Sequence, residues 1–123
     1  MAKKVLLVDD STTTLMMEEM ILKQNTNYEC FTAKDGVDAI TCAVEHSPDL
    51  VLMDVVMPRL NGFEACKHMR AHSELSRIPI ILVTTRGEED YVATGFQSGC
   101  NDYITKPINS RELVTLLRSY LGE

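Results

Sequence analysis

The sequence predicts an open α/β sheet in which buried parallel strands alternate with helices that cover them. Two observations lead to this prediction. Short runs of consecutive apolar residues recur along the 123-residue chain, and such runs are typical of strands buried on both faces, as in parallel sheets. A segment with helical spacing of its apolar residues follows each strand-like run, so strand and helix alternate five times.

Three strand-like runs are apolar at consecutive positions and are expected at the centre of the sheet. They are VLLV (Val5–Val8), LVLM (Leu50–Met53) and PIILV (Pro79–Val83). Two weaker runs are YECFTA (Tyr28–Ala33), which is mixed in polarity, and DYIT (Asp102–Thr105), which is short. Edge strands are commonly short and more polar, so these two are expected at the edges.

The first two helices are predicted from the spacing of their apolar residues. The first is expected from about Thr12 to Gln24, with hydroxyl residues at its start. The side chains expected to face the core are Met16, Met17, Met20 and Ile21. The second helix is expected to begin after Asp35-Gly36. Its apolar residues at helical spacing are Val37, Ile40 and Val44.

The third and fourth helices carry terminal signals. Asn61 followed by Glu64 has the pattern of a capping box and predicts the start of the third. The fourth opens with the acidic stretch 88–90, which is favourable at a helix N-terminus, and ends at Gly99. Gly95 lies inside the fourth helix and costs about 1 kcal/mol relative to alanine. We therefore expect this helix to be the least stable.

The fifth helix repeats the capping signal of the third, with Asn109 followed by Glu112. The side chains expected to be buried are Leu113, Leu116, Leu117 and Tyr120. Only Gly122 and Glu123 follow, so we expect no DNA-binding or enzymatic output segment in this chain.

Length, charge and cysteine pattern narrow the class of protein. A chain of 123 residues suffices for one domain, residues 1–123, but not for two. The net charge of −6 argues against nucleic acid and membrane surfaces as direct partners. No apolar run approaches the roughly 18 residues of a membrane span, and MAKK does not begin a secretory signal, so we expect a cytoplasmic protein. The cysteines are expected to be free thiols, and His68 and His72 to be solvated.

Polar residues at the ends of the strand-like runs form the candidate site. Asp9 and Asp10 end the first run and Asp54 the third, while Thr84 and Lys106 end the last two. Ligands of open parallel sheets bind at the carboxyl ends of the strands, so the three aspartates are expected to converge. Their mutual repulsion calls for a cation, and hard oxygen ligands suit Mg²⁺, with Mn²⁺ as a substitute. Together with a lysine and a hydroxyl, this set is typical of phosphoryl-transfer sites.

Four motifs carry a family resemblance over essentially the whole chain. They are VDDS (8–11), LMDVVMPRLNGFE (52–64), VTT (83–85) and DYITKP (102–107). In this order and at this spacing, the sequence closely resembles the receiver domain of two-component response regulators, nearest to the single-domain chemotaxis type. The resemblance implies a flavodoxin-like, doubly wound fold. Such a fold has a five-stranded parallel sheet of order 2-1-3-4-5 with five helices on both faces.

The resemblance also implies the roles of the acidic residues. Asp54 would be the phosphoacceptor, a carboxylate nucleophile that takes a phosphoryl group from a histidine kinase or a phosphotransfer protein. Asp10 would bind Mg²⁺ directly and Asp9 through water. The backbone carbonyl of Val56 would complete the metal ligands that the protein supplies.

By the same resemblance, Lys106 would pair with the phosphoryl oxygens and Thr84 would bond to one of them. Tyr103 would be the switch aromatic that turns inward when Thr84 moves, and the Lys106-Pro107 peptide would be cis. The added phosphoryl group brings roughly two negative charges and can bias a two-state loop by on the order of a few kcal/mol. The fourth helix, fifth strand and fifth helix would then present a changed face to a downstream protein. We expect a monomer that can dimerise on phosphorylation.

Three positions near the predicted site residues depart from the chemotaxis pattern. Val56 is apolar where that type has a polar residue, and Arg86 is basic where it has an acid. Thr85 is also bulkier than the alanine common there. These changes leave the expected chemistry intact. We predict that Val56 and Arg86 set the rate at which the phosphorylated form decays.

Other classes of protein fit part of the pattern. A flavodoxin-like electron carrier would bind phosphate at DDSTTT, but this stretch has no glycine and its two aspartates would repel the anion. A hydrolase with an aspartyl-phosphate intermediate would need a second carboxylate, and Val56 stands where it would serve. A degenerate receiver that binds partners without phosphorylation usually lacks one of the five polar site residues, which are all present here. A receiver excised from a larger regulator remains an open alternative.

Overall fold

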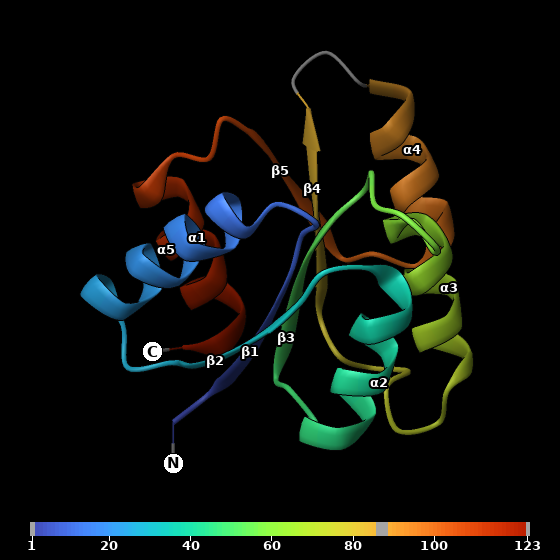
Figure 1. Ribbon diagram of the computed structural model, residues 1–123, viewed down its shortest axis with the longest axis horizontal. Helices are drawn as coiled ribbons and strands as arrows, with labels where there is room; N and C mark the ends of the chain where they lie inside the picture. Colours follow the sequence, from blue (N-terminus) through green and yellow to red (C-terminus); the bar gives the residue numbers. More distant parts are fainter. Residues whose placement is uncertain (1, 86–88, 123) are drawn as a thin grey trace.

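The computed structural model describes residues 2–85 and 89–122, and its strands form one five-stranded parallel sheet in the order β2-β1-β3-β4-β5 (Figure 1). The strands are β1 (Lys4–Val8), β2 (Glu29–Ala33), β3 (Leu50–Asp54), β4 (Ile80–Thr85) and β5 (Asp102–Lys106). The helices are α1 (Thr12–Asn25), α2 (Gly36–His46), α3 (Gly62–Ala71), α4 (Glu89–Ser98) and α5 (Ser110–Leu121). The predicted fold class, the alternation of strands and helices, and the strand order are confirmed.

The three consecutive apolar runs occupy the centre of the sheet, as predicted. β1 pairs with β3 and β3 with β4, all parallel, while β2 and β5 form the two edges. The residues of β1 and β3 are almost all buried, whereas β2 exposes Glu29 and Thr32. Strands covered on both faces must be apolar at every position, and this requirement made the central strands visible in the sequence.

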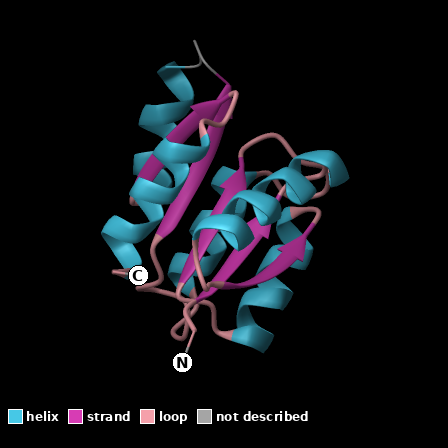
Figure 2. Ribbon diagram, turned by 90° about the vertical axis from the view of Figure 1, so that its left-hand side faces the viewer, coloured by secondary structure: helices cyan, strands magenta, loops and turns pink. Residues whose placement is uncertain are grey.

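Helices cover both faces of the sheet (Figure 1). α1 and α5 lie on one face, over a core cluster that includes Leu7, Leu52 and Leu117. α2, α3 and α4 lie on the other, over a cluster that includes Leu6 and Met53. Successive residues of a strand point to opposite faces, and so neighbours in one strand belong to different clusters. Figure 2 views the molecule from the side of α1 and α5 and shows the twist of the sheet behind these helices.

The predicted inward face of α1 is wrong for its methionines. Met16 and Met20 are 62% and 58% exposed, and Met17 is also exposed, while Ile21 packs partly against the core. The buried residues are Leu15, Glu18 and Leu22. They are spaced i, i+3 and i+7 and therefore share one face of the helix. The methionines project from other, exposed sides of the helix. A prediction based on hydrophobicity places the methionines inside and does not identify Glu18 as a buried residue.

The apolar residues predicted for α2 are only partly buried. Val37 and Val44 are exposed, and Ile40 is half-buried against the core. The residues of α2 that the structure buries are Gly36, Ala39 and Ala43. Small side chains on this face allow α2 to approach its neighbours closely, and the larger valines are left outside.

The prediction for α5 holds for most of its inward face. Leu113 and Leu117 are fully buried and Leu116 packs partly against the core. Tyr120 is exposed instead, and its hydroxyl donates to Asp102 Oδ2 at 3.2 Å. The remaining buried positions of α5 belong to Val114 and Leu121. A phenolic hydroxyl needs a polar partner, which explains why Tyr120 stays near the surface.

The predicted helix signals are present where the structure describes them. Asn61 and Glu64 form a capping box at the start of α3, and the side chain of Asn109 caps α5 by accepting from the Glu112 N–H. Gly99 follows α4 with φ 105°, the left-handed region that favours glycine. The stretch predicted to open α4 includes Glu88, which lies outside the described residues.

The structure also bears on the predictions for the cysteines, for His68 and His72, and for membrane-spanning helices. All four cysteines are free thiols. His72 is the C-cap of α3, and its Nδ1 atom accepts from the backbone N–H of Glu74, while His68 is exposed. Within residues 2–85 and 89–122, no helix has both the length and the hydropathy needed to cross a bilayer.

We predict that α4 exchanges its amide hydrogens faster than α1 under native conditions. Gly95 lies against β4, where an added Cβ would come within 3.0 Å of a Leu82 methyl group. A larger residue would be tight against β4 here, and glycine weakens the helix by about 1 kcal/mol relative to alanine. Hydrogen exchange measured by mass spectrometry or NMR on one sample compares the two helices directly. Equal protection of α4 and α1 would contradict the prediction.

Candidate functional site

The three aspartates singled out in the sequence converge at the carboxyl end of the sheet. Asp9 and Asp10 directly follow β1, and Asp54 ends β3, which pairs with β1 through Val8 and Met53. One carboxylate oxygen of each aspartate lies within 4.8 Å of those of the other two. The predicted convergence is confirmed, and it follows from the adjacency of β1 and β3.

Local hydrogen bonds fix the orientation of the two buried carboxylates. Asp9 is fully buried and its Oδ1 accepts from the backbone N–H of Ser11 at 2.9 Å. Ser11 is the N-cap of α1, and its hydroxyl accepts from the N–H of Thr14. Asp54 is nearly buried and its Oδ1 accepts from the Val55 N–H at 2.9 Å. The hydroxyl residues after Asp10 therefore begin a helix, as predicted.

Lys106 supplies the positive charge of the site. It ends β5 and is followed by a cis peptide bond to Pro107, as predicted. Its Nζ atom lies 3.3 Å from Asp9 Oδ2 and 3.3 Å from Asp54 Oδ2. One ammonium group thus bridges two carboxylates that come from different strands.

Burial and neighbouring charges shift the proton affinities of the site. Burial, followed by the charge of Asp9, raises the pKa of Asp54 above its ordinary value, although Lys106 acts in the opposite direction. Partial burial disfavours the charged form of Lys106, but the carboxylates of Asp54 and Asp9 outweigh it and raise the pKa of the lysine. Ionisation of Asp54 therefore has a cost that a further cation would offset.

The donor atoms of the cluster suit a hard divalent cation. Three carboxylate oxygens face one another, and a single ammonium leaves their negative charge in excess. Asp10 is exposed, so a bound ion would keep access to water. Mg²⁺ binds such oxygen ligands and retains several water molecules. The residues present therefore fit the predicted magnesium ion.

Of the other predicted residues, Thr84 and Val56 lie near the carboxyl edge of the sheet, outside the aspartate cluster, whereas Tyr103 lies near the start of β5. Thr84 is buried near the end of β4, one residue after Val83, which pairs with Asp54. Val56 lies two residues after the end of β3 and is 64% exposed. Tyr103 is exposed on β5, where its ring packs edge-on against Phe96 with centroids 6.3 Å apart. Arg86 lies outside the described residues.

Glu18 is a buried carboxyl group that the sequence analysis missed. It is 1% exposed on the inner face of α1, and its Oε1 atom has no hydrogen-bond partner in the described part of the chain. Burial, then the charge of Asp9, raises its pKa to about 8, with Lys106 opposing and Asp54 adding to the rise. The spacing of Glu18 between Leu15 and Leu22 was the signal that could have revealed it.

Arg59 is a second residue that the sequence did not single out. It lies in the loop between β3 and α3 and forms ion pairs with Asp35 and Asp38 at 2.8 and 2.9 Å. Its partners precede it by 24 and 21 residues, at the start of α2, and no local pattern links them.

Comparison with known proteins relates the chain to a family and to several solved structures. The model of the response regulator receiver domain matches residues 5–118. A Chloroflexus aurantiacus protein classed as a response regulator has a TM-score of 0.94, with 32% identity over 100% of both chains. The Vibrio cholerae chemotaxis response regulator CheY4 has a TM-score of 0.90 and 32% identity, covering 98% of this chain and 99% of that one. The receiver domain of the Pseudomonas aeruginosa sensor histidine kinase PA1611 has a TM-score of 0.90 and 30% identity over 100% of both chains. Its structure holds a magnesium ion coordinated in the active-site cleft.

We predict that Glu18 makes the protein less stable as the pH rises from about 4.5 to about 8. In the unfolded chain the carboxyl loses its proton near 4.5, whereas the folded protein keeps it until the pH approaches 8. The folded state therefore binds more protons in this window, and its stability falls as pH increases. Compared with Glu18→Gln, which cannot ionise, the wild type should lose on the order of a few kcal/mol between pH 5 and 8.5.

Urea unfolding at both pH values measures this difference. Glu19→Gln is a matched control, because Glu19 is the exposed neighbour of Glu18 on the same helix. The control should follow the wild type. A wild-type profile parallel to that of Glu18→Gln would show that Glu18 is ionised in the folded protein at neutral pH.

Proposed function

The chain belongs to the response regulator receiver domain family, and we propose that it acts in a phosphorelay by accepting a phosphoryl group on Asp54. The donor is a histidine kinase or a phosphotransfer protein, and the reaction depends on Mg²⁺. The convergence of Asp9, Asp10 and Asp54 beside the ammonium of Lys106 carries this proposal. It is a polar site of the kind that binds a phosphoryl group and a divalent cation together.

The proposed chemistry is a direct transfer to a carboxylate. A carboxylate oxygen of Asp54 attacks phosphorus, an O–P bond forms, and the bond from phosphorus to the donor histidine nitrogen breaks. The electron pair of that bond stays on the imidazole, which can then take a proton. The ionised form of Asp54 is the nucleophile, and its closeness to Lys106 favours that form despite burial.

The cation site is assigned to the acidic residues and one backbone group. Asp10 would bind Mg²⁺ directly, Asp9 through water, and the carbonyl of Val56 would add a neutral oxygen. Mn²⁺ is expected to substitute, since both ions accept oxygen ligands. When bound, the ion neutralises the carboxylates and the charge on the incoming phosphoryl oxygens. The magnesium in the PA1611 receiver domain supports this assignment.

Lys106 and Thr84 are proposed to hold the transferred group. The Lys106 ammonium already lies 3.3 Å from Asp54 Oδ2, within reach of the oxygens of a phosphoryl group attached to that carboxylate. Thr84 is buried near the end of the neighbouring strand, where its hydroxyl can donate after a small movement. Its movement would allow Tyr103 to leave the surface and turn inward.

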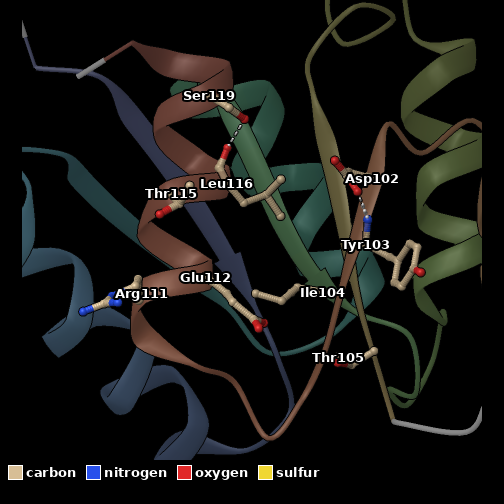
Figure 3. A pocket seen from close by; sticks show the side chains of 9 residues that line it. All are labelled: Asp102, Tyr103, Ile104, Thr105, Arg111, Glu112, Thr115, Leu116 and Ser119. Carbon is tan, nitrogen blue, oxygen red and sulfur yellow. Dashed lines mark hydrogen bonds between the residues drawn. The ribbon is translucent and has the colours of Figure 1, made fainter.

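The response is proposed to reach a downstream protein through α4, β5 and α5. Phe96 and Tyr103 are large apolar side chains exposed on this face. A groove of about 700 Å³ lies between β5 and α5, and Figure 3 shows Ile104 and Leu116 lining it while the ring of Tyr103 lies on the other side of β5. An exposed apolar surface of this kind suits a protein partner.

We infer a cytoplasmic protein that binds no nucleic acid directly and acts as a monomer, with a dimer as an outcome of phosphorylation. Autodephosphorylation, assisted by the same residues, would return it to the starting state. A chemotaxis or motility pathway is in keeping with the similarity to CheY4. A phosphorylation-independent receiver, or a receiver that belongs to a longer regulator, is the alternative.

We predict that incubation with a small phosphodonor and Mg²⁺ adds one phosphoryl group to the protein. Intact-mass measurement detects the increase, which should be absent when Mg²⁺ is chelated and in Asp54→Asn. Asp49→Asn is a matched control, because Asp49 is exposed and precedes β3 at the opposite end of that strand. An unmodified wild-type protein would favour the phosphorylation-independent alternative.

We predict that Val56 and Arg86 control the lifetime of the phosphorylated form. The exposed valine offers no hydrogen bond to an attacking water beside Asp54, so Val56→Asn should accelerate decay roughly fivefold, equivalent to about 1 kcal/mol in the barrier. In a double variant that combines Val56→Asn with Arg86→Glu, the decay rate should differ still more from that of the wild type. Phosphate release measures decay, and Val44→Asn on α2 is the control. A rate that is unchanged in the double variant would refute the prediction.

A further inference from the structure

The loop between β3 and α3, residues 55–61, is fixed at its base by the protein backbone. The N–H of Val55 donates to Val83 at 3.2 Å, and the carbonyl of Val55 accepts from the Gly62 N–H at 2.9 Å. The side chain of Met57 is buried in the core. Val56, the residue assigned to the metal through its carbonyl, lies between these two fixed neighbours. The position of the loop therefore decides where that carbonyl points.

Arg59 fastens the outer part of this loop to α2. Its backbone has φ 65°, the left-handed region that residues with a Cβ atom rarely adopt. Its Nε donates to Asp35 Oδ2 at 2.8 Å and its Nη2 to Asp38 Oδ1 at 2.9 Å, while Nη2 also lies 2.8 Å from Asp35 Oδ2. A planar guanidinium that bonds two carboxylates is a directional attachment as well as a charge pair.

Backbone contacts support the same attachment. The N–H of Gly36 donates to the carbonyl of Leu60 at 3.1 Å, and a Cβ atom at Gly36 would come within 2.8 Å of the Leu60 Cβ. Asp35, which receives Arg59, is also the N-cap of α2, with its Oδ1 accepting from the Asp38 N–H. The start of α2 and the tip of the loop are thus held as one unit.

We propose that Arg59 is a positioning residue, whose ion pairs with Asp35 and Asp38 hold the loop so that the Val56 carbonyl faces the metal site. This inference rests on the proposed function. A direct electrostatic role of Arg59 would have the opposite sign, because removal of a cation favours binding of Mg²⁺. The charges that shift the pKa of Asp54 include those of Asp9 and Lys106, and the charge of Arg59 is not among the causes of the shift.

The test is an NMR titration of the full chain with Mg²⁺ alone, using Arg59→Asn and Asp35→Asn. Asparagine tolerates positive φ at position 59 and keeps the N-cap at position 35, so each variant removes the ion pair with little other change. Both should weaken Mg²⁺ binding, by roughly tenfold, the low end for residues that orient metal ligands. The double variant should bind no more weakly than the weaker single variant, because both substitutions break the same attachment.

Two further variants separate position from charge. Arg77→Asn removes one exposed arginine from the opposite end of the sheet, near the start of β4, and should bind Mg²⁺ as the wild type does. Arg59→Lys keeps the charge without the planar fork and should bind with intermediate affinity. If Arg59→Asn fails to fold, Arg59→Lys and Asp35→Asn together still test the inference. If Arg59→Lys binds Mg²⁺ as tightly as the wild type, a positive charge at position 59 is sufficient and the geometry of the guanidinium is not needed. This result would overturn the inference.

The outcomes also separate this inference from the proposed function. If the wild type binds Mg²⁺ and the variants bind equally well, or if Arg59→Asn and Asp35→Asn shift affinity in opposite directions, the positioning role is wrong and the proposed function stands. If the wild type does not bind Mg²⁺, both are wrong in their dependence on the metal.

Discussion

The site depends on one lysine ammonium shared between two buried carboxylates. Lys106 lies 3.3 Å from an oxygen of Asp9 and 3.3 Å from an oxygen of Asp54, whose side chains are 1% and 10% exposed. Burial of a carboxylate without a partner costs several kcal/mol, so the ammonium is a condition for this arrangement. With Asp10 added, one positive charge still faces three negative ones. The imbalance explains why the site suits a divalent cation and a phosphoryl group together.

Another buried carboxyl group, on the inner face of α1, is neutralised by a proton instead of a cation. Glu18 is buried between Leu15 and Leu22, and the charge of Asp9 adds to the effect of burial on its pKa. At neutral pH a proton keeps this carboxyl uncharged, whereas Lys106 offsets part of the negative charge of the site's aspartates and leaves the rest for a cation. The negative field of the site therefore extends into the core, and the two groups of carboxyls are neutralised by different means.

Sequence reasoning succeeded where one physical requirement acted on consecutive residues. The central strands had to be apolar on both faces, and the ends of β1 and β3 had to meet, so the fold class and the aspartate cluster could be predicted. It failed for the inner face of α1, since Met16 and Met20 are more hydrophobic than the buried Glu18. It also missed Arg59, whose partners lie more than twenty residues away in the chain. Such contacts exist only after the loop has folded against α2.

We propose that Asp54, the carboxylate held by Lys106, accepts the phosphoryl group in the presence of Mg²⁺. Borohydride reduces an acyl phosphate of aspartate to homoserine, so treatment of the phosphorylated protein followed by peptide mass mapping identifies the acceptor. We expect homoserine at position 54, and none when Mg²⁺ is chelated before the phosphodonor is added. Homoserine at position 9 or 10, or at position 54 without Mg²⁺, would contradict the account.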